Sequence, residues 1–293
     1  PVCKIIPAGV FFGVPCYIGP DCYFNIDDFI KEMEYLESHN FDTNLIFLSP
    51  RLHIIANEHK EEDLLKYKNQ QGSTGKGIAP CAGTKFRRQG ILLKDCKNPK
   101  LDKFRKNIWK EPTNIINPIY GRILCEGAQG FWLDINYGNY PYVTSSTTLP
   151  YSACSLGFPP QKINNIYGAV KIYDTRVGRD PDFDDLPQCP ILDKIAEVGK
   201  EYGSTTNRKR KVNWLNMDKL IQAINISGTT HVIISKVDVL EEVKQFKLIV
   251  NGSIMNYYTM ENLKSSINKK LLDKCPLIET IIYSDNPETI NEL

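Results

Sequence analysis

Apolar residues recur at helical intervals in two stretches of the chain. Residues 26–38 carry them at spacings of three and four, and Asn25 just before them can accept hydrogen bonds from the first free amides. Residues 217–226 repeat this arrangement, with Asn216 as the cap and Gly228 near the end. We therefore expect an amphipathic helix at each place.

Short apolar runs between these helices predict buried strands. The expected strands are residues 44–48, 123–125, 230–235 and 278–283. Shorter helices are expected over residues 58–70 and 193–201. Two further runs flank Asn251-Gly252, a dipeptide typical of a two-residue hairpin turn. Because helices and short strands alternate, the pattern favours an α/β fold with a mainly parallel sheet, flanking helices and a small antiparallel hairpin.

Composition narrows the class of protein. The 293 residues are 42% hydrophobic and 24% charged, with a net charge of +2, which gives no reason to expect nucleic-acid or membrane binding. The 9 cysteines are scattered without a C-x-x-C pair, and the 4 histidines form no ligand cluster, so a metal held by protein side chains alone is not expected. This cysteine usage indicates reduced thiols and a cytoplasmic protein.

A glycine-rich stretch followed by hydroxyls lies near the middle of the chain. Gly127 and Gly130 flank Gln129, and small residues there let a ligand approach the main chain closely. Residues 144–146 are Thr-Ser-Ser, and hydroxyls with free backbone amides suit a phosphate oxygen. A strand, an irregular turn and a second strand is the alternative interpretation.

The glycine-rich residues 72–80, GSTGKGIAP, are expected to form a loop, and they fail the Walker A pattern. That pattern requires Ser or Thr after the lysine and a glycine at its start, whereas Gly77 follows Lys76 and Gln70 holds the first position. A phosphate-binding loop of another kind and a flexible surface loop both remain open.

Two further segments carry candidate binding groups. Residues 203–210, GSTTNRKR, combine hydroxyls with an arginine fork and suit a dicarboxylate; a solvated basic face is the alternative. Lys236 and Asp238 follow the strand expected over residues 230–235. A carboxylate there can accept hydrogen bonds from guanine N1–H and its 2-amino group, although a surface ion pair is the alternative.

Taken together, these segments resemble the adenylosuccinate synthetase family, the GTP-dependent ligases that join aspartate to IMP. The matching stretches are EGAQG…YPYVTSS, GSTGKGIAP, EYGSTTNRKRKVNWL and ISKVDVL, and the likeness runs from Ile5 over almost the whole chain. The resemblance implies a P-loop NTPase-like central sheet and a single domain over residues 1–293.

The resemblance also implies roles for individual residues. For IMP they are Thr74, Arg88, Gln129, Leu133, Thr144, Val177 and Arg208. For aspartate they are Gly203, Thr205, Thr206, Arg208 and Arg210. For GTP they are Arg210, Lys236, Asp238, Ser284, Asn286 and Pro287. Because the family's equivalent of Arg88 reaches the IMP of the other subunit, a homodimer is implied.

Two catalytic motifs of the family have no counterpart here. These are the GDEGKGK loop with the catalytic Asp and the NAGHT run with the catalytic His. The chain begins at Pro1 in an apolar run, which we interpret as entry part-way through a domain. We expect both catalytic groups and most Mg²⁺ ligands upstream of Pro1, so no catalytic or metal-binding residue is assigned.

Two alternatives to IMP ligation stay open. One is the related ligase that joins aspartate to dGMP and makes 2-aminoadenylosuccinate, although residues 144–146 and Asp238 look more like those of IMP and GTP enzymes. The other is a non-catalytic guanine-nucleotide-binding remnant, if the 293 residues are the whole protein.

Overall fold

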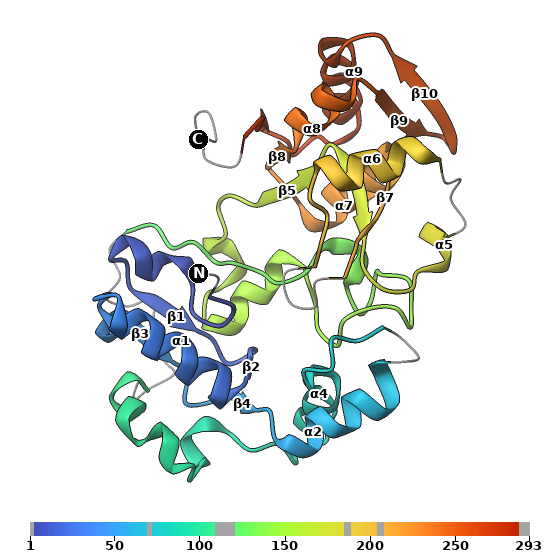
Figure 1. Cartoon of the computed structure of the whole chain (residues 1–293). Coiled ribbons are helices and arrows are strands. Elements are labelled where there is room, and N and C mark those ends of the chain that lie inside the picture. The colour runs from blue at the N-terminus through green and yellow to red at the C-terminus, as the bar shows by residue number, and fades with distance from the viewer. Residues whose placement is uncertain (1–2, 69–71, 109–120, 185–188, 204–207, 287–293) are drawn as a thin grey trace. The chain divides into compact units, whose positions relative to one another are not determined.

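A computed structural model describes residues 3–68, 72–108, 121–184, 189–203 and 208–286 of the chain (Figure 1). Its internal contacts divide the chain into two compact units, Pro1–Lys162 (unit 1) and Ile163–Leu293 (unit 2), and each is described by itself. The single domain expected over residues 1–293 stays a prediction.

Unit 1 combines short parallel strand pairs with helices. Its strands are β1 (Cys16–Ile18), β2 (Tyr23–Phe24), β3 (Ile46–Leu48) and β4 (His53–Ile54), with β1 parallel to β3 and β2 parallel to β4. Its α-helices are α1 (Ile26–Ser38), α2 (Asn57–Glu62) and α4 (Ile78–Phe86), and a π-helical turn, η3 (Asp63–Tyr67), continues α2. Its 3-10 helices are η1 (Ala8–Phe12), η2 (Thr43–Leu45), η4 (Leu93–Asp95), η5 (Pro99–Asn107), η6 (Phe131–Leu133), η7 (Pro150–Leu156) and η8 (Pro160–Lys162).

Helix α1 begins and ends where its sequence predicts. The Asn25 side chain accepts a hydrogen bond from the Asp28 amide and donates one to the Asp28 carboxylate, at 3.3 and 3.0 Å. Phe29, Met33 and Leu36 recur on one face and are fully buried. They pack with residues of β1 and β3 in one hydrophobic cluster, which is the core of unit 1.

Two expectations for unit 1 are wrong. Residues 123–125 form no strand, and Leu124 is 84% exposed. Among the described residues no strand pairs with this run, so its amides make no hydrogen bonds to a neighbouring strand. The loop after Gly72 ends at Gly77 rather than Pro80, because α4 starts at Ile78. Pro80 fits the first turn of α4, where its missing N–H breaks no helical hydrogen bond.

Unit 2 holds two sheets. Its strands are β5 (Tyr167–Lys171), β6 (Tyr173–Arg176), β7 (Lys211–Asn216), β8 (His231–Ser235), β9 (Phe246–Val250), β10 (Ser253–Tyr257) and β11 (Thr280–Tyr283). Its helices are α5 (Pro181–Asp184), α6 (Pro190–Val198), α7 (Met217–Ser227), α8 (Val237–Val243) and α9 (Met260–Lys274). One sheet, in the order β11-β8-β5, is parallel; the other, β10-β9-β7-β6, is parallel only at β7–β9.

The expected hairpin and the α/β fold class are confirmed in unit 2. Strands β9 and β10 flank Asn251 and Gly252, whose φ angles of 49° and 72° are those of a tight hairpin turn. Trp214, Leu215 and Ile234 from the strands are buried in one core with residues of α7, α8 and α9. Asn216 caps α7 and Gly228 ends it in a left-handed conformation, as predicted.

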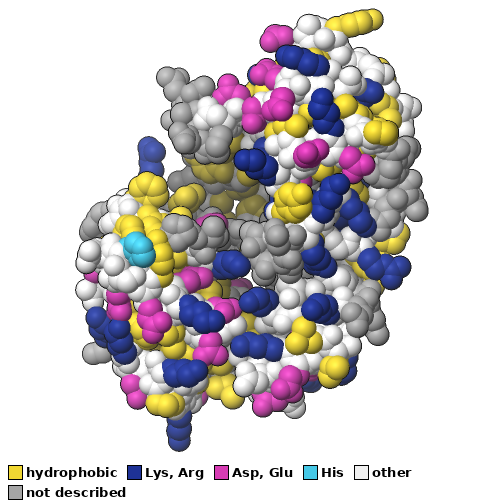
Figure 2. Space-filling model, in the orientation of Figure 1, with side chains coloured by type: hydrophobic (Ala, Val, Ile, Leu, Met, Phe, Trp, Pro, Cys, Tyr) yellow, Lys and Arg dark blue, Asp and Glu magenta, His cyan; other side chains and the backbone are white. Residues whose placement is uncertain are grey.

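The surface carries charges of both signs, and Figure 2 shows the Lys and Arg side chains interspersed with Asp and Glu over the visible face. Within the described ranges, no helix has the length and apolar content needed to cross a bilayer.

Helix α6 covers residues 190–198 and not the predicted 193–201. It ends because Lys200 adopts a left-handed conformation with φ of 50°. The Lys200 amide then donates to Glu197 O at 3.0 Å and the Glu201 amide to Ala196 O at 2.9 Å, the paired bonds of a Schellman motif. Glu201 therefore closes the motif, three residues after the last residue of α6, and its amide is held by Ala196 O.

We expect Lys200→Gly to raise the free energy of unfolding by about 1 kcal/mol, because glycine adopts this conformation without a Cβ clash. Urea titration measures the change. Lys194→Gly, at an exposed position inside α6, is the matched control and should lower stability by about 1 kcal/mol. A lower stability for Lys200→Gly would contradict the strain argument.

The raised pKa of the Asp174 carboxyl makes the free energy of unfolding depend on pH. Desolvation raises the pKa of this β6 carboxyl to about 7, although the Asn216 amide, at 3.0 Å, and Lys219 act to lower it. A raised folded pKa means that the stabilising contribution is complete below the unfolded value near 3.8 and is lost as pH rises through about 7. Asp174→Asn keeps an acceptor for Asn216 and removes this loss, so the stability of the variant relative to wild type should rise by about 2–3 kcal/mol from pH 5 to pH 8. Urea titrations at both pH values test this, and an equal difference at both would refute it.

Candidate functional site

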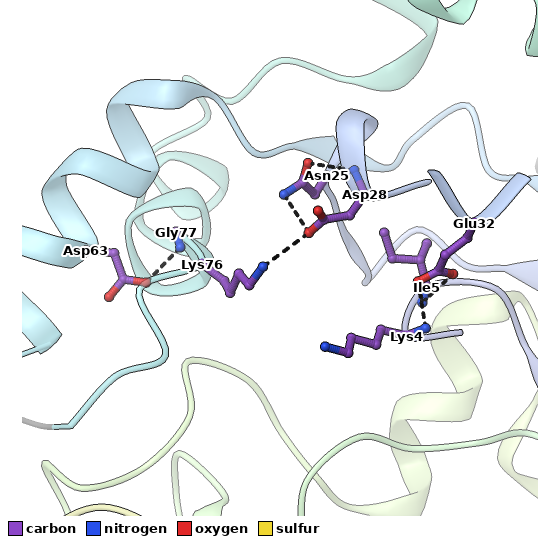
Figure 3. Close-up of polar contacts among 8 residues, drawn as sticks. All are labelled: Lys4, Ile5, Asn25, Asp28, Glu32, Asp63, Lys76 and Gly77. Carbon is purple, nitrogen blue, oxygen red and sulfur yellow. Dashed lines mark hydrogen bonds and ion pairs between the residues drawn. The ribbon is translucent and has the colours of Figure 1, made fainter. Parts of the chain in front are cut away.

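The loop 72–77 is held at its end by a buried carboxylate. Asp63, in η3, is 1% exposed and accepts a hydrogen bond from the Gly77 amide at 2.7 Å (Figure 3). Gly77 has φ of 80°, and a Cβ there would lie 2.9 Å from Ile55 Cγ2 and 3.0 Å from the His59 backbone. Only glycine fits at this position, so the loop enters α4 in a fixed direction.

A surface ion pair connects the same loop to α1. Lys76 Nζ lies 3.5 Å from Asp28 Oδ2, and Figure 3 shows the lysine side chain extending toward that carboxylate. Exposed pairs such as Lys76–Asp28 contribute little, so the lysine can leave Asp28 for an anionic ligand.

A second carboxylate of α1, that of Glu32, accepts hydrogen bonds from the amides of Lys4, Ile5 and Ile6 at 2.7–3.1 Å.

Thr74 lies before α4 in the chain, and Arg88 lies just after it. Thr74 lies exposed on the loop before the helix. Arg88 follows the helix in a left-handed conformation with φ of 62°, and its amide donates to Lys85 O at 2.9 Å. Both side chains are exposed and thus accessible to a ligand.

The segment after Gln129 is organised by Asp134, which the sequence did not single out. The carboxylate is fully buried and accepts hydrogen bonds from the amides of Asn136, Tyr137 and Thr148 and the hydroxyl of Thr147, at 2.6–3.3 Å. Desolvation raises its pKa, but these donors outweigh it, and the pKa is lowered. The only sequence signal is one acidic residue among apolar ones.

Around this carboxylate the structure brings two predicted residues together. The Thr144 amide donates to Leu133 O at 2.8 Å, so these residues are neighbours in space. Gln129 is exposed and has φ of 61°. Gly138 admits no side chain, because a Cβ would lie 2.6 Å from Trp132 O.

In unit 2 the candidate guanine-binding residues lie at the carboxyl ends of two adjacent parallel strands. Asp238 is exposed in the first turn of α8, directly after β8. The Val237 amide donates to Ser284 O at 3.3 Å, and the Ser284 amide donates to Ile234 O at 2.8 Å. These bonds bring the segment around Asp238 to the end of β11, as expected for a ligand site in an open α/β sheet.

Lys236 and Asn286, two more of the candidate guanine-binding residues, follow the ends of β8 and β11. Lys236 has φ of 67°, and its Nζ donates to Gly199 O at 3.1 Å, at the end of α6. Asn286 is exposed, and its backbone oxygen accepts from the Ser284 hydroxyl at 2.9 Å. Pro287 lies outside the described residues.

The candidate aspartate loop is closed at its base by a short antiparallel ladder. The Gly203 amide donates to Arg208 O at 2.8 Å, and the Arg210 amide donates to Glu201 O at 2.9 Å. Tyr202 forms an antiparallel bridge with Lys209 between these two bonds. Thr205 and Thr206 fall outside the described residues.

Beside this ladder, Glu201 is a second organising carboxylate that the sequence did not reveal. It is 2% exposed and accepts from Lys171 Nζ at 2.6 Å, Tyr173 Oη at 2.7 Å and Arg210 Nη1 at 3.1 Å. Desolvation opposes ionisation, but the donors lower the pKa of the carboxyl overall. Sequence spacing offers no signal, because Lys171 and Tyr173 lie far from it in the chain.

Val177 directly follows β6 and is half-buried. The preceding residue, Arg176, pairs with Asp180 through Nε and Oδ2 at 3.2 Å, with both side chains buried. This pair fixes the backbone on either side of Val177.

Comparison with known proteins identifies one family. The model of the adenylosuccinate synthetase family matches residues 2–120 and 114–280. Adenylosuccinate synthetase of Borrelia turicatae is 31% identical over 95% of this chain and 73% of its own length, and that of Candida albicans is 32% identical over 79% and 65%.

Among solved structures, the fully ligated adenylosuccinate synthetase of Plasmodium falciparum is similar, with a TM-score of 0.77 and 25% identity over 96% of this chain and 85% of that one. The cyanophage S-2L succinoaminodeoxyadenylate synthetase bound to dGMP and dATP shares the fold, with a TM-score of 0.61 and 18% identity over 91% of this chain and 84% of that one. The resemblance seen in the motifs is confirmed: the chain belongs to the adenylosuccinate synthetase family, the GTP-dependent ligases that join L-aspartate to IMP through a new C–N bond.

Proposed function

We propose that the protein catalyses GTP-dependent ligation of L-aspartate to IMP, giving adenylosuccinate, GDP and phosphate in purine nucleotide biosynthesis. The observation that carries the proposal is the exposed Asp238 carboxylate beside the end of β11. Its two oxygens can accept hydrogen bonds from guanine N1–H and the 2-amino group, whereas adenine offers no such pair of donors. Lys236 and Asn286 lie on the same strand ends, and we include Ser284 and Pro287 in the base site.

The exposed Thr74, Arg88 and Gln129, and the ladder that begins at Gly203, support the IMP and aspartate sites that we propose. For IMP we propose Thr74 and Arg88 from the segment around α4. From the central segment and unit 2 we add Gln129, Leu133, Thr144, Val177 and Arg208. For aspartate we propose Gly203, Thr205, Thr206, Arg208 and Arg210, with the arginine forks on carboxylate oxygens.

Family chemistry also involves Mg²⁺, which neutralises charge on the transferring phosphoryl group. In the part of the chain that the structure describes, no group of three His, Cys, Asp or Glu side chains is arranged to hold a metal ion. The described residues thus do not by themselves fit a complete magnesium site, and we derive no step through it.

We further propose a cytoplasmic homodimer. Arg88 is exposed at the end of α4, a position that suits a contact with IMP bound to a second subunit. The alternatives are a dGMP–aspartate ligase and a non-catalytic guanine-nucleotide-binding remnant. The cyanophage likeness shows the fold alone and does not favour dGMP.

Turnover by the full-length protein distinguishes these functions. IMP or dGMP is supplied with aspartate and with GTP or ATP, and the formation of adenylosuccinate from IMP, or of 2-aminoadenylosuccinate from dGMP, is followed by absorbance. We expect turnover with IMP and GTP. Turnover only with dGMP would favour the first alternative, and guanine-nucleotide binding without turnover of either acceptor would favour the second.

Asp238→Asn should lower kcat/KM for GTP by roughly a hundredfold, because the amide can no longer accept from both guanine donors and leaves one unpaired. The measurement compares GTP with ATP in the full-length enzyme. Glu242→Gln, which removes a charge one turn further along α8, is the control and should leave this ratio unchanged. An unchanged GTP preference in Asp238→Asn would refute the base-site assignment.

A further inference from the structure

We propose that Glu201 is a positioning residue for Arg210: it holds both the main chain and the guanidinium of Arg210 in the conformation that receives a carboxylate of the substrate aspartate. This inference rests on the proposed function, in which Arg210 binds aspartate. Two bonds of different kinds carry it, because the Glu201 carbonyl accepts from the Arg210 amide at 2.9 Å and the carboxylate accepts from Arg210 Nη1 at 3.1 Å.

The position of Glu201 is itself fixed by backbone bonds on both sides. The Schellman motif at the end of α6 holds its amide on Ala196 O, and the ladder to Arg210 holds its carbonyl. Gly203 and Arg208 extend the same ladder toward the loop tip. A displacement of Glu201 would therefore move the base of the whole loop.

The orientation of the carboxylate is fixed as well. Tyr173 Oη, 1% exposed, donates to Glu201 Oε1 at 2.7 Å, which leaves Oε2 for the two cations. Gly199 allows this contact, because a Cβ there would lie 2.3 Å from Tyr173 Oη and 3.4 Å from Glu201 Cγ. The carboxylate thus has one orientation relative to the β6 strand and the end of α6.

The charges in this cluster favour a second anion. Lys171 Nζ and Arg210 Nη1 both contact Glu201 Oε2, at 2.6 and 3.1 Å, so two cations share one buried carboxylate. Desolvation lowers the pKa of Lys171; Glu201 acts to raise it, while the nearby charges of Arg210 and Lys236 lower it further. The excess of positive charge is relieved when a substrate carboxylate binds.

Arg210 has donors left for that carboxylate. Its side chain is 28% exposed and reaches Glu201 through Nη1. Elsewhere in the described ranges no acceptor is within hydrogen-bonding distance of the guanidinium, which carries five N–H groups in a fixed fork. Anchoring one side of the fork leaves the other preorganised for a bidentate contact, which lowers the entropy lost on binding.

The test uses Glu201→Gln, Arg210→Leu and the double variant in the full-length enzyme, with KM for aspartate, KM for GTP and kcat measured separately. Glu201→Gln should raise the aspartate KM roughly tenfold or more, the usual effect of losing a charge-assisted hydrogen bond. The double variant should resemble Arg210→Leu alone, because Glu201 acts through Arg210. Glu201→Asp should partly restore the aspartate KM.

Two more variants separate positioning from a general loss of structure. Tyr173→Phe keeps every charge and removes only the bond that orients the carboxylate, so it should raise the aspartate KM severalfold. If Glu201→Gln does not fold, the aspartate KM of Tyr173→Phe tests the positioning role by itself. Lys209→Met is the control, because Lys209 lies next to Arg210 in the ladder but pairs with Asp193 at the surface, 2.9 Å away. It should leave all three constants unchanged.

The outcomes distinguish this inference from the proposed function. An increased aspartate KM in Arg210→Leu, with no change in Glu201→Gln or Tyr173→Phe, would overturn the positioning role and leave the function standing. Fully additive effects in the double variant would overturn it too. An unchanged aspartate KM in Arg210→Leu would instead overturn the assignment of the loop to aspartate.

Discussion

A carboxylate removed from water must find hydrogen-bond donors, and in this protein that requirement fixes the loops on which the candidate site depends. Asp63 takes the Gly77 amide where loop 72–77 enters α4. Asp134 accepts hydrogen bonds from amides of the segment that carries Leu133 and Thr144, and so holds that segment in place. In each case the donors are amides or side chains of otherwise irregular backbone, which has no ladder of its own to hold it.

The groups that hold the loops and those proposed to bind ligands differ in exposure. Asp134 and Glu201 are buried, while Thr74 and Asp238 are exposed. A buried carboxylate with several donors is costly to disturb, so it keeps the backbone in place while an exposed neighbour exchanges water for a ligand. Arg210 lies between these extremes, with one donor on Glu201 and the rest of the fork accessible.

Four of the seven non-glycine residues with left-handed backbone in the described ranges lie in or beside the candidate site. Arg88, Gln129, Lys200 and Lys236 all have φ between 50° and 67°. Each such residue costs free energy that the surrounding contacts must offset, and this strain is characteristic of functional loops. At Lys200 the offset is visible, since the Schellman bonds that follow place Glu201 beside Arg210.

The sequence by itself determined the features that depend on neighbours in the chain. Helix α1 with its Asn25 cap, helix α7 and the hairpin at Asn251 follow from propensity and spacing, and the motifs identified the family. Tertiary structure alone decided that residues 123–125 form no strand, because strand formation needs a partner elsewhere in the chain. It also decided the roles of Asp134 and Glu201, whose meaning comes from donors that long-range folding brings to a buried carboxylate.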